Sequence, residues 1–217
     1  MNSFSNMDGS VILDNMIRVI QEKKQYLSDI DGAIGDGDHG INMNKGFTMT
    51  GEALEKQQGD FSHGLLTLSK ILMMRIGGSM GPLYGKIFKT MGKSLAGHDQ
   101  VDKKLFREAL NGIKESLAAL TPAGVGDKTL VDALYPAIDA FNEACNSDLD
   151  FITALQAMKQ AAESGRDNTK DMISKLGRSS RLGERSRGVI DAGAASCSLL
   201  LGTMADSIIE LLEEKED

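Results

Sequence analysis

The chain has 217 residues, which is enough for one sizeable hydrophobic core or two small domains. Hydrophobic residues make up 41% and charged residues 25%, a balance typical of globular proteins. The net charge of −7 argues against nonspecific nucleic-acid binding and against an anionic membrane surface. The N-terminus lacks the features of a signal peptide, and no apolar run is expected to reach membrane-spanning length. We therefore expect a cytoplasmic protein.

Apolar residues recur at helical spacing along most of the chain, and proline and valine are scarce. About eight helices with short connections predict one all-α domain over residues 1–217, with neighbouring helices largely antiparallel. The tail after Leu212 is expected to fray. The spacing predicts helices over residues 10–30, 40–56, 60–77, from about 82, 102–120, 130–145 with a kink at Pro136, 150–165, 168–176 and 191–212.

The most unusual stretch, between residues 31 and 42, holds three carboxylates, four glycines, a histidine and an amide. Unpaired carboxylates are too costly to bury, and the glycines disfavour a regular helix. A tight loop that directs Asp31, Asp36 and Asp38 at one hard cation explains this composition. A solvated acidic turn is the plainer interpretation, but the nearby His39 and Asn42 favour a site.

Three common motifs do not account for this stretch. Its Gly-x-Gly-x-x-Gly pattern follows a predicted helix rather than the strand that dinucleotide binding requires. An EF-hand loop fails because Gly40, Ile41 and Phe47 stand at key positions, and no phosphate-loop sequence precedes Lys86 or Lys128. The remaining interpretation is a magnesium site whose coordination is completed by water and phosphate oxygens.

Three further loops separate the predicted helices. Residues 77–85 contain five glycines or prolines whose backbone can approach an anion closely, although a tight helix–helix turn is an equal alternative. Residues 121–129 form a second loop. Residues 177–188 carry four arginines, Arg178, Arg181, Arg185 and Arg187, in an otherwise acidic chain. Guanidinium groups suit phosphate, whereas a solvated basic loop is the usual meaning of such a run.

Four motifs in this order resemble the nucleotide-binding L subunit of dihydroxyacetone kinase over essentially the whole chain. They are Gly35-Asp-Gly-Asp-His-Gly-Ile-Asn42, Gly77-Gly-Ser-Met-Gly-Pro-Leu-Tyr-Gly85, Gly126-Asp-Lys-Thr-Leu-Val-Asp132, and Gly177-Arg-Ser-Ser-Arg-Leu-Gly183 followed by Asp191-Ala-Gly193. The resemblance implies an eight-helix antiparallel barrel that binds ADP or ATP and two Mg²⁺ ions at one end.

The resemblance also implies roles for particular residues. Asp31, Asp36 and Asp38 would bind the metal ions and, with Arg178, would act in catalysis. Backbone N–H groups around Gly78 would stabilise phosphate charge. The implied nucleotide contacts are His39, Gly40, Ile41, Asn42, Gly78, Ser79, Met80, Gly124, Leu130, Arg178, Asp191, Ala192 and Gly193.

This sequence departs from the family pattern at several of these positions. Met80 replaces the serine before Gly-Pro-Leu, so that Ser79 is the nearest hydroxyl. Arg181 and Val189 replace a tyrosine and a histidine, and Ala192 replaces a proline. These positions lie where the family contacts the nucleotide or a partner.

The resemblance implies a subunit of a phosphoenolpyruvate-dependent system, because the chain has no room for a separate dihydroxyacetone-binding domain. Bound ADP would receive a phosphoryl group from a phosphotransferase-system M subunit and pass it to dihydroxyacetone on a K subunit. His39 is interpreted as a nucleotide contact rather than a phosphorylated nucleophile, because a nearby metal ion favours direct transfer.

Two other functions remain open. The chain is alternatively the ATP-exchanging part of a related ketose, sugar or fatty acid kinase, from which the nucleotide would dissociate. It is also open to interpretation as a nucleotide-state sensor that binds a transcription regulator. A plain helical scaffold leaves the three close aspartates unexplained.

Overall fold

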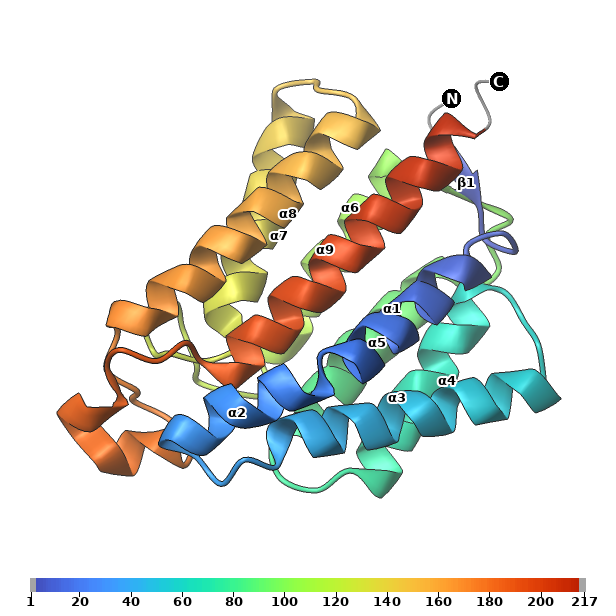
Figure 1. Cartoon of the computed structure of the whole chain (residues 1–217). Coiled ribbons are helices and arrows are strands. Elements are labelled where there is room, and N and C mark those ends of the chain that lie inside the picture. Colours follow the sequence, from blue (N-terminus) through green and yellow to red (C-terminus); the bar gives the residue numbers. More distant parts are fainter. Residues whose placement is uncertain (1–2, 215–217) are drawn as a thin grey trace.

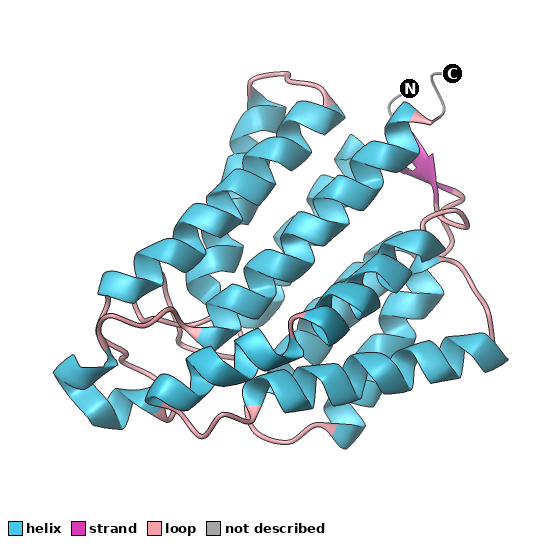
Figure 2. Ribbon diagram, in the orientation of Figure 1, coloured by secondary structure: helices cyan, strands magenta, loops and turns pink. Residues whose placement is uncertain are grey.

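The computed structural model describes residues 3–214, which are almost entirely helical (Figures 1 and 2). A short antiparallel pair joins β1 (Ser3–Ser5) to β2 (Gln100–Asp102), with Phe4 opposite Val101. Two 3₁₀ segments, η1 (Thr169–Asp171) and η2 (Ser179–Ser186), lie between the last two helices. The α-helices of the described residues are α1 (Ser10–Glu22), α2 (Lys24–Ile34), α3 (His39–Lys56), α4 (Phe61–Arg75), α5 (Met80–Leu95), α6 (Lys103–Ala118), α7 (Val131–Asn146), α8 (Phe151–Asn168) and α9 (Ala192–Glu213).

The helices close into a ring. α1 packs against α3, and from α3 to α9 each helix packs against the next one in the chain. α9 packs back against α1, so the last helix closes the barrel on the first. α2 follows α1 after a single residue and extends the same wall, which makes eight walls in all. The all-α class and the eight-helix barrel expected for the chain are confirmed.

Aspartate side chains define where four of the helices begin. Asp60, Asp102, Asp150 and Asp191 each accept a hydrogen bond from the backbone N–H three residues later. Such a cap satisfies one of the N–H groups that the first turn of a helix leaves without a partner. These starts were readable in the sequence, and the cap at Asp191 fixes the first turn of α9 beside the loops discussed below.

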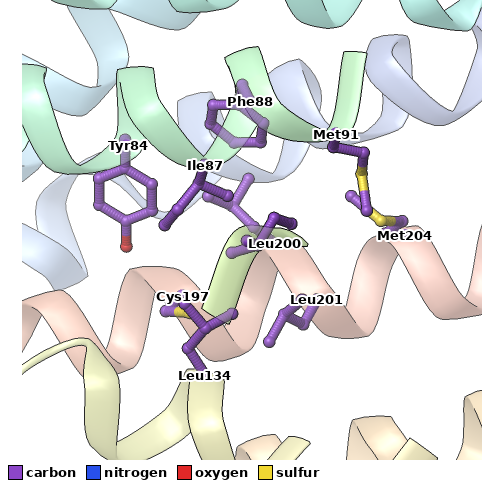
Figure 3. Close-up of a pocket in the computed structure, with 10 residues that line it drawn as sticks. Tyr84, Ile87, Phe88, Met91, Leu134, Cys197, Leu200, Leu201 and Met204 are labelled. Carbon is purple, nitrogen blue, oxygen red and sulfur yellow. The ribbon is translucent and has the colours of Figure 1, made fainter. Parts of the chain in front are cut away.

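Side chains fill the interior of the barrel. A small cavity of about 20 Å³ lies between α5, α6, α7 and α9, and Figure 3 shows residues that line it. It has room for about one water molecule. The buried side chains of the described residues therefore form a packed core inside the barrel. The lining consists of Tyr84, Ile87, Phe88, Met91, Ile113, Leu134, Cys197, Leu200, Leu201 and Met204.

Helix α9 corrects the expectation that no apolar run approaches membrane-spanning length. Ala192–Glu213 is long and apolar enough by length and composition to cross a membrane. However, 72% of its most apolar window is buried inside the protein. It packs against α1, α7 and α8, which explains its composition as that of a core helix.

Local structure differs from the expectation in three other places. The helix expected over residues 10–30 is interrupted at Lys23, and the second part turns to pack on α3 and η2. The short helix expected over residues 168–176 is only the 3₁₀ turn η1, and the arginine-rich loop contains η2. The β1–β2 pair was not expected. No glycine or proline marks the break at Lys23, so tertiary packing determines it. The C-terminal tail was expected to fray, and its residues 215–217 lie outside the part of the chain that the structure describes.

Candidate functional site

A cleft of about 610 Å³ lies at the end of the barrel where α3, α5, α7 and α9 begin. Its wall is formed by the connections α2–α3, α4–α5, α6–α7 and α8–α9. Figure 2 shows these loops gathered at one end, whereas the strand and the α7–α8 turn lie at the other. A cleft of this volume is suited to a small molecule such as a cofactor.

Three carboxylates converge on one side of the cleft. Asp31 stands in the last turn of α2, and Asp36 and Asp38 follow before α3. One ligand oxygen from each lies within 4.8 Å of the others. The turn requires glycine, because Gly37 has a φ of +75° and a Cβ at position 35 would lie 2.6 Å from Oδ1 of Asp31. Oxygen ligands in this arrangement fit a hard divalent cation such as Mg²⁺.

Arg178 approaches the same carboxylates from across the cleft. Its Nη1 atom pairs with Oδ2 of Asp36 and lies 3.9 Å from Oδ2 of Asp38. The guanidinium offsets the repulsion between the carboxylates in the absence of another cation. All three side chains are more than two-fifths exposed, so the pairing is weak enough for an ion or a ligand to displace.

Four helix N-termini face the cleft. His39, Met80, Val131 and Ala192 are the first residues of α3, α5, α7 and α9, and all four line it. The N-cap residues of α3 and α5 make no capping hydrogen bond with their side chains. The N–H of His39 at the start of α3 donates to Oδ2 of Asp31 at 3.3 Å, so the start of α5 is the better place for an anion to bind backbone N–H groups. The backbone at Gly78 has a φ of +70° and open space where a Cβ would stand. Dipoles and free N–H groups therefore create a local site for phosphate in an acidic protein.

His39 is held in place by hydroxyl groups from two other helices. Its Nε2 atom lies 2.8 Å from Oγ of Ser196, which lies 2.6 Å from the hydroxyl of Tyr84. The Tyr84 hydroxyl donates to the carbonyl of Gly193 at 3.1 Å. Burial lowers the pKa of His39 to about 4, against the opposing effect of Asp31, so the ring is neutral at pH 7. A neutral ring with one nitrogen already engaged favours a positioning or contact role.

The structure brings most of the predicted site residues together. Three do not line the cleft: Gly40 is buried against α2, Ile41 is 53% exposed on α3, and the Gly124 N–H donates to Asp127 within the α6–α7 loop. These three lie beside the cleft. The predicted residues in its wall are Asp31, Asp36, Asp38, His39, Asn42, Gly78, Ser79, Met80, Leu130, Arg178, Asp191, Ala192 and Gly193.

Other residues of the wall were not predicted as site residues. Pro122 and Leu176 add apolar surface, and Tyr84 and Lys128 add polar groups. Both polar residues stand in motifs that the sequence singles out. Nothing local, however, indicates that Tyr84 meets α9 or that Lys128 is buried, because those contacts join segments far apart in the chain.

Comparison with known proteins shows the family to which the chain belongs. The model of the DAK2 domain matches residues 33–206. The ADP-binding subunit DhaL of a PEP-dependent dihydroxyacetone kinase from Listeria innocua is 33% identical over 204 residues, which cover 91% of this chain and 92% of that one. The DhaL subunit of Escherichia coli is 31% identical, with coverages of 86% and 90%. A D-erythrulose kinase of Mycolicibacterium smegmatis is 30% identical, and the match spans 34% of its length.

Solved structures agree on the fold. The dihydroxyacetone kinase of C. freundii in its native form superposes with a TM-score of 0.70 and 24% identity, over 92% of this chain and 34% of that one. Its complex with AMP-PNP and Mg²⁺ gives a TM-score of 0.64 and 22% identity, over 90% and 33%. The resemblance drawn from the four motifs is thus confirmed. The chain belongs to the DAK2-domain family, as a relative of the ADP-binding DhaL subunits of PEP-dependent dihydroxyacetone kinases.

Proposed function

We propose that this chain is the ADP-binding subunit of a phosphoenolpyruvate-dependent dihydroxyacetone kinase. The observation that carries the proposal is one cleft that combines three convergent carboxylates with four helix N-termini. It lies in a chain that matches DhaL subunits over about nine-tenths of its length. We also propose that residues 1–217 form a single nucleotide-binding domain in the cytoplasm.

In this proposal the phosphates of ADP or ATP lie against the starts of α3 and α5. Asp31, Asp36 and Asp38 hold Mg²⁺, which when bound neutralises charge on the phosphate oxygens and orients them. Leu130, which is buried at the start of α7, packs against the adenine. Arg178 leaves the carboxylates and contacts phosphate, for which its planar donor group is well suited.

Phosphoryl transfer depends on positioning and charge stabilisation more than on covalent chemistry by the protein. The proposed contribution of this chain is therefore to fix the phosphates and to keep positive groups around them. His39 stays neutral and bonded to Ser196, so we assign it to nucleotide contact. We assign no general base to the chain, because the acceptor hydroxyl belongs to a substrate held by another subunit.

The proposed partners are a K subunit that holds dihydroxyacetone and a phosphotransferase-type M subunit that supplies the phosphoryl group. Apolar side chains near the cleft support docking of a protein there. Ile41 is 53% exposed, Met74 67% and Val125 59%, and each is close in the chain to residues that line the cleft. Large exposed apolar side chains near a site are typical of protein contacts.

The first test is to denature the purified protein and to identify what it releases. About one ADP per chain, together with magnesium, is the expected result for a retained cofactor. The second step adds a K subunit, an M subunit and phosphoenolpyruvate, and follows dihydroxyacetone phosphate. The proposal would be overturned if the purified protein released no nucleotide and also failed to bind ADP or ATP that was added to it.

A second candidate is the nucleotide-exchanging part of a ketose kinase. It is favoured by erythrulose kinases among the relatives, at 30% and 32% identity. ATP that binds weakly and dissociates during gel filtration, with phosphorylation of erythrulose and without an M subunit, would support it. Capture of a transcription regulator in the ADP state would support the third interpretation, a nucleotide-state sensor.

A further inference from the structure

Lys128 is a buried cation to which the proposed chemistry gives no role. It is 1% exposed, although it belongs to the Gly-Asp-Lys-Thr sequence that leads into α7 and lines the cleft. Its φ of +60° places it in the left-handed region, which is unfavourable for residues other than glycine. Glycine would suit this backbone better, so the side chain must contribute enough to offset the cost.

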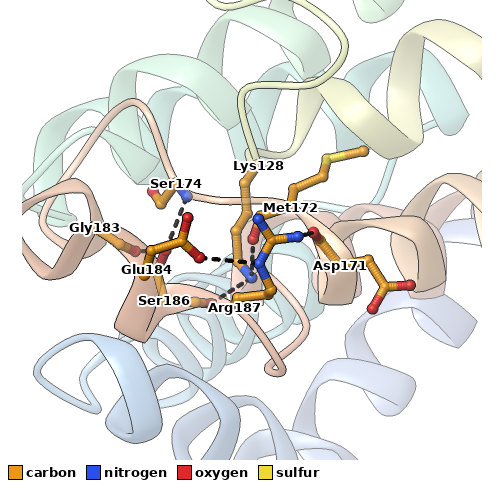
Figure 4. Close-up of polar contacts among 8 residues, drawn as sticks. All are labelled: Lys128, Asp171, Met172, Ser174, Gly183, Glu184, Ser186 and Arg187. Atoms are coloured by element: carbon orange, nitrogen blue, oxygen red, sulfur yellow. Dashed lines mark hydrogen bonds and ion pairs between the residues drawn. The ribbon is translucent and has the colours of Figure 1, made fainter.

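The contacts of the ammonium group show what this contribution is. Nζ donates to the carbonyl oxygens of Ser186 and Val189, at 2.6 Å each, and to that of Met172 at 3.2 Å. Figure 4 shows Nζ directed at the turn around Ser186 and Met172. A lysine ammonium has three hydrogens, and three acceptors use all of them. In this structure Lys128 therefore has no donor left for a phosphate group.

The three acceptors lie at the two ends of one segment. We call residues 172–189 the arginine strap; Met172 begins it, and Ser186 and Val189 are near its end. Arg178 stands in the middle of the strap and reaches Asp36 across the cleft. By joining both ends to the start of α7, Lys128 closes the base of a loop whose tip carries the guanidinium.

Further hydrogen bonds hold the base of the strap together, whereas residues nearer its tip line the cleft. Oγ of Ser186 accepts from the N–H of Ser174 at 2.9 Å and donates to the carbonyl of Gly183 at 2.6 Å. Nη1 of Arg187 donates to the carbonyl of Asp171 at 2.7 Å (Figure 4). Toward the tip, Leu176, Gly177, Arg178 and Ser179 line the cleft.

We propose that Lys128 is a positioning residue that holds both ends of the arginine strap and thereby places Arg178 over the cleft. This inference rests on the proposed function for its effect on nucleotide binding, whereas its effect on the strap does not depend on any ligand. The contacts assign the lysine to the backbone of another segment.

The test compares Lys128→Met, Arg178→Met and the double variant. Hydrogen exchange of the ligand-free proteins should show faster exchange over residues 172–189 in Lys128→Met, with α3 and α5 unchanged. The dissociation constant for Mg·ADP should rise about tenfold in each single variant and no further in the double variant, because both changes remove the same guanidinium contact. Lys159→Met is the matched control, since its pair with Asp206 joins α8 to α9 at the surface and lies outside the strap.

Two results would overturn the proposal. One is unchanged exchange over the strap in Lys128→Met, and the other is a double variant whose losses multiply, as expected for a direct phosphate ligand. If Lys128→Met does not fold, Ser186→Ala provides a second test, because it removes hydrogen bonds at the same base and leaves the lysine intact. Hydrogen exchange over residues 172–189 should become faster in this variant, and Mg·ADP should bind more weakly. Absence of ADP binding by the unchanged protein would defeat the proposed function alone, because the exchange measurement still decides the role of Lys128.

Discussion

Asp36 is the residue at which the proposed metal site and the arginine contact meet. Its carboxylate belongs to the acidic cluster and pairs with Arg178. Asp36 is exposed to solvent at the edge of the cleft. The ion pair of Asp36 contributes little to the free energy of unfolding, because it is exposed to solvent. The carboxylate is therefore expected to matter more for binding than for stability. Changes at Asp36 should therefore separate binding from folding.

We expect Asp36→Asn to weaken Mg²⁺ and nucleotide binding together, because a neutral amide is a poorer ligand for a hard cation than a carboxylate. The dissociation constant for Mg·ADP, measured by calorimetry, should rise about tenfold or more, and the circular dichroism spectrum should not change. Asp29→Asn is the control, since Asp29 is an exposed acid of α2 that contacts Gln25 at 2.7 Å. Equal affinities of the unchanged protein and Asp36→Asn would rule out the metal site.

Asp191 differs from Asp36 because it is a buried acid. Burial raises its pKa to about 7, and the carboxylates of Asp132 and Asp31 act in the same direction. The N–H of Ala194 and the ammonium of Lys128 oppose this rise. Between the ordinary value of 3.8 and about 7, the folded chain holds more protons than the unfolded chain, so this group makes stability fall as pH rises.

Asp191→Asn should remove this pH dependence and keep an oxygen that caps α9. The free energy of unfolding of the variant, relative to that of the unchanged protein, should increase between about pH 4 and about pH 7. The slope should be at most about 1.4 kcal/mol per pH unit, and the difference should be constant at higher pH. Urea unfolding at several pH values measures it, and a difference independent of pH would show that Asp191 does not titrate in this window.

At the scale of elements, the crossing of α2 and α3 sets the spacing of the acidic cluster. Gly40 permits it: a Cβ at this position would lie 2.0 Å from the carbonyl oxygen of Lys24 and 2.7 Å from the backbone nitrogen of Ser28. Both atoms belong to the backbone of α2 and cannot move as a flexible side chain would. The glycine is thus required for packing, in addition to any backbone contact with a ligand.

Gly40→Ala should therefore force α2 and α3 apart and separate Asp31 from Asp36 and Asp38. We expect a loss of about 2–4 kcal/mol in the free energy of unfolding, together with weaker Mg²⁺ binding. Gly51→Ala is the control on the same helix, because the nearest atom to its Cβ would be 3.7 Å away. That change should be neutral or stabilise by up to about 1 kcal/mol. Equal effects of the two alanines in urea unfolding would contradict this account.

Helices could be predicted from the sequence where local signals determine them. The aspartate caps and apolar periodicity gave the starts of α4, α6, α8 and α9 closely. The break at Lys23 could not be predicted, since no local signal marks it and the direction of α2 follows its packing on α3 and η2. The role of Lys128 was equally hidden, because its acceptors lie 44 to 61 residues away in the chain.

The candidate site also contains residues that the sequence indicated and residues that it did not. Asp31, Asp36, Asp38 and His39 lie within nine residues, so their composition alone indicated a site. Ser196, which holds His39, lies 157 residues away and has no sequence signal of its own. Local clusters of chemical groups are visible in a single sequence, whereas the groups that orient them depend on how the barrel closes.

At the scale of the whole molecule, the ring explains why one end of the barrel attracts anions. Successive helices alternate in direction, so α3, α5, α7 and α9 all begin at the same end (Figure 1). Their positive dipole ends gather where the loops form the cleft. This local arrangement opposes the net charge of −7, which by itself would repel a nucleotide.

The other end of the barrel is closed by Asn6, which is 2% exposed. Its Nδ2 atom donates to the carbonyls of Leu95 and His98 at 3.2 and 3.0 Å, and its Oδ1 atom accepts from the N–H of Ser62 at 3.2 Å. One side chain thus joins the N-terminal segment to the start of α4 and the end of α5. Since the loops of the cleft lie at the opposite end, stability and binding should be separable here.

Asn6→Ala should lower the free energy of unfolding by about 2–4 kcal/mol, because it removes the hydrogen bonds of Asn6 to the buried N–H of Ser62 and to two carbonyl groups. The affinity for Mg·ADP should stay within about twofold of the unchanged protein at a temperature where the variant is folded. Ser3→Ala is the control, since it removes only the exposed hydrogen bond of Ser3 to Gln100. Urea unfolding and calorimetry on the same samples provide both measurements. If affinity fell in step with stability, the two ends of the barrel would be coupled, and the cleft would depend on closure of the whole ring rather than on its own loops.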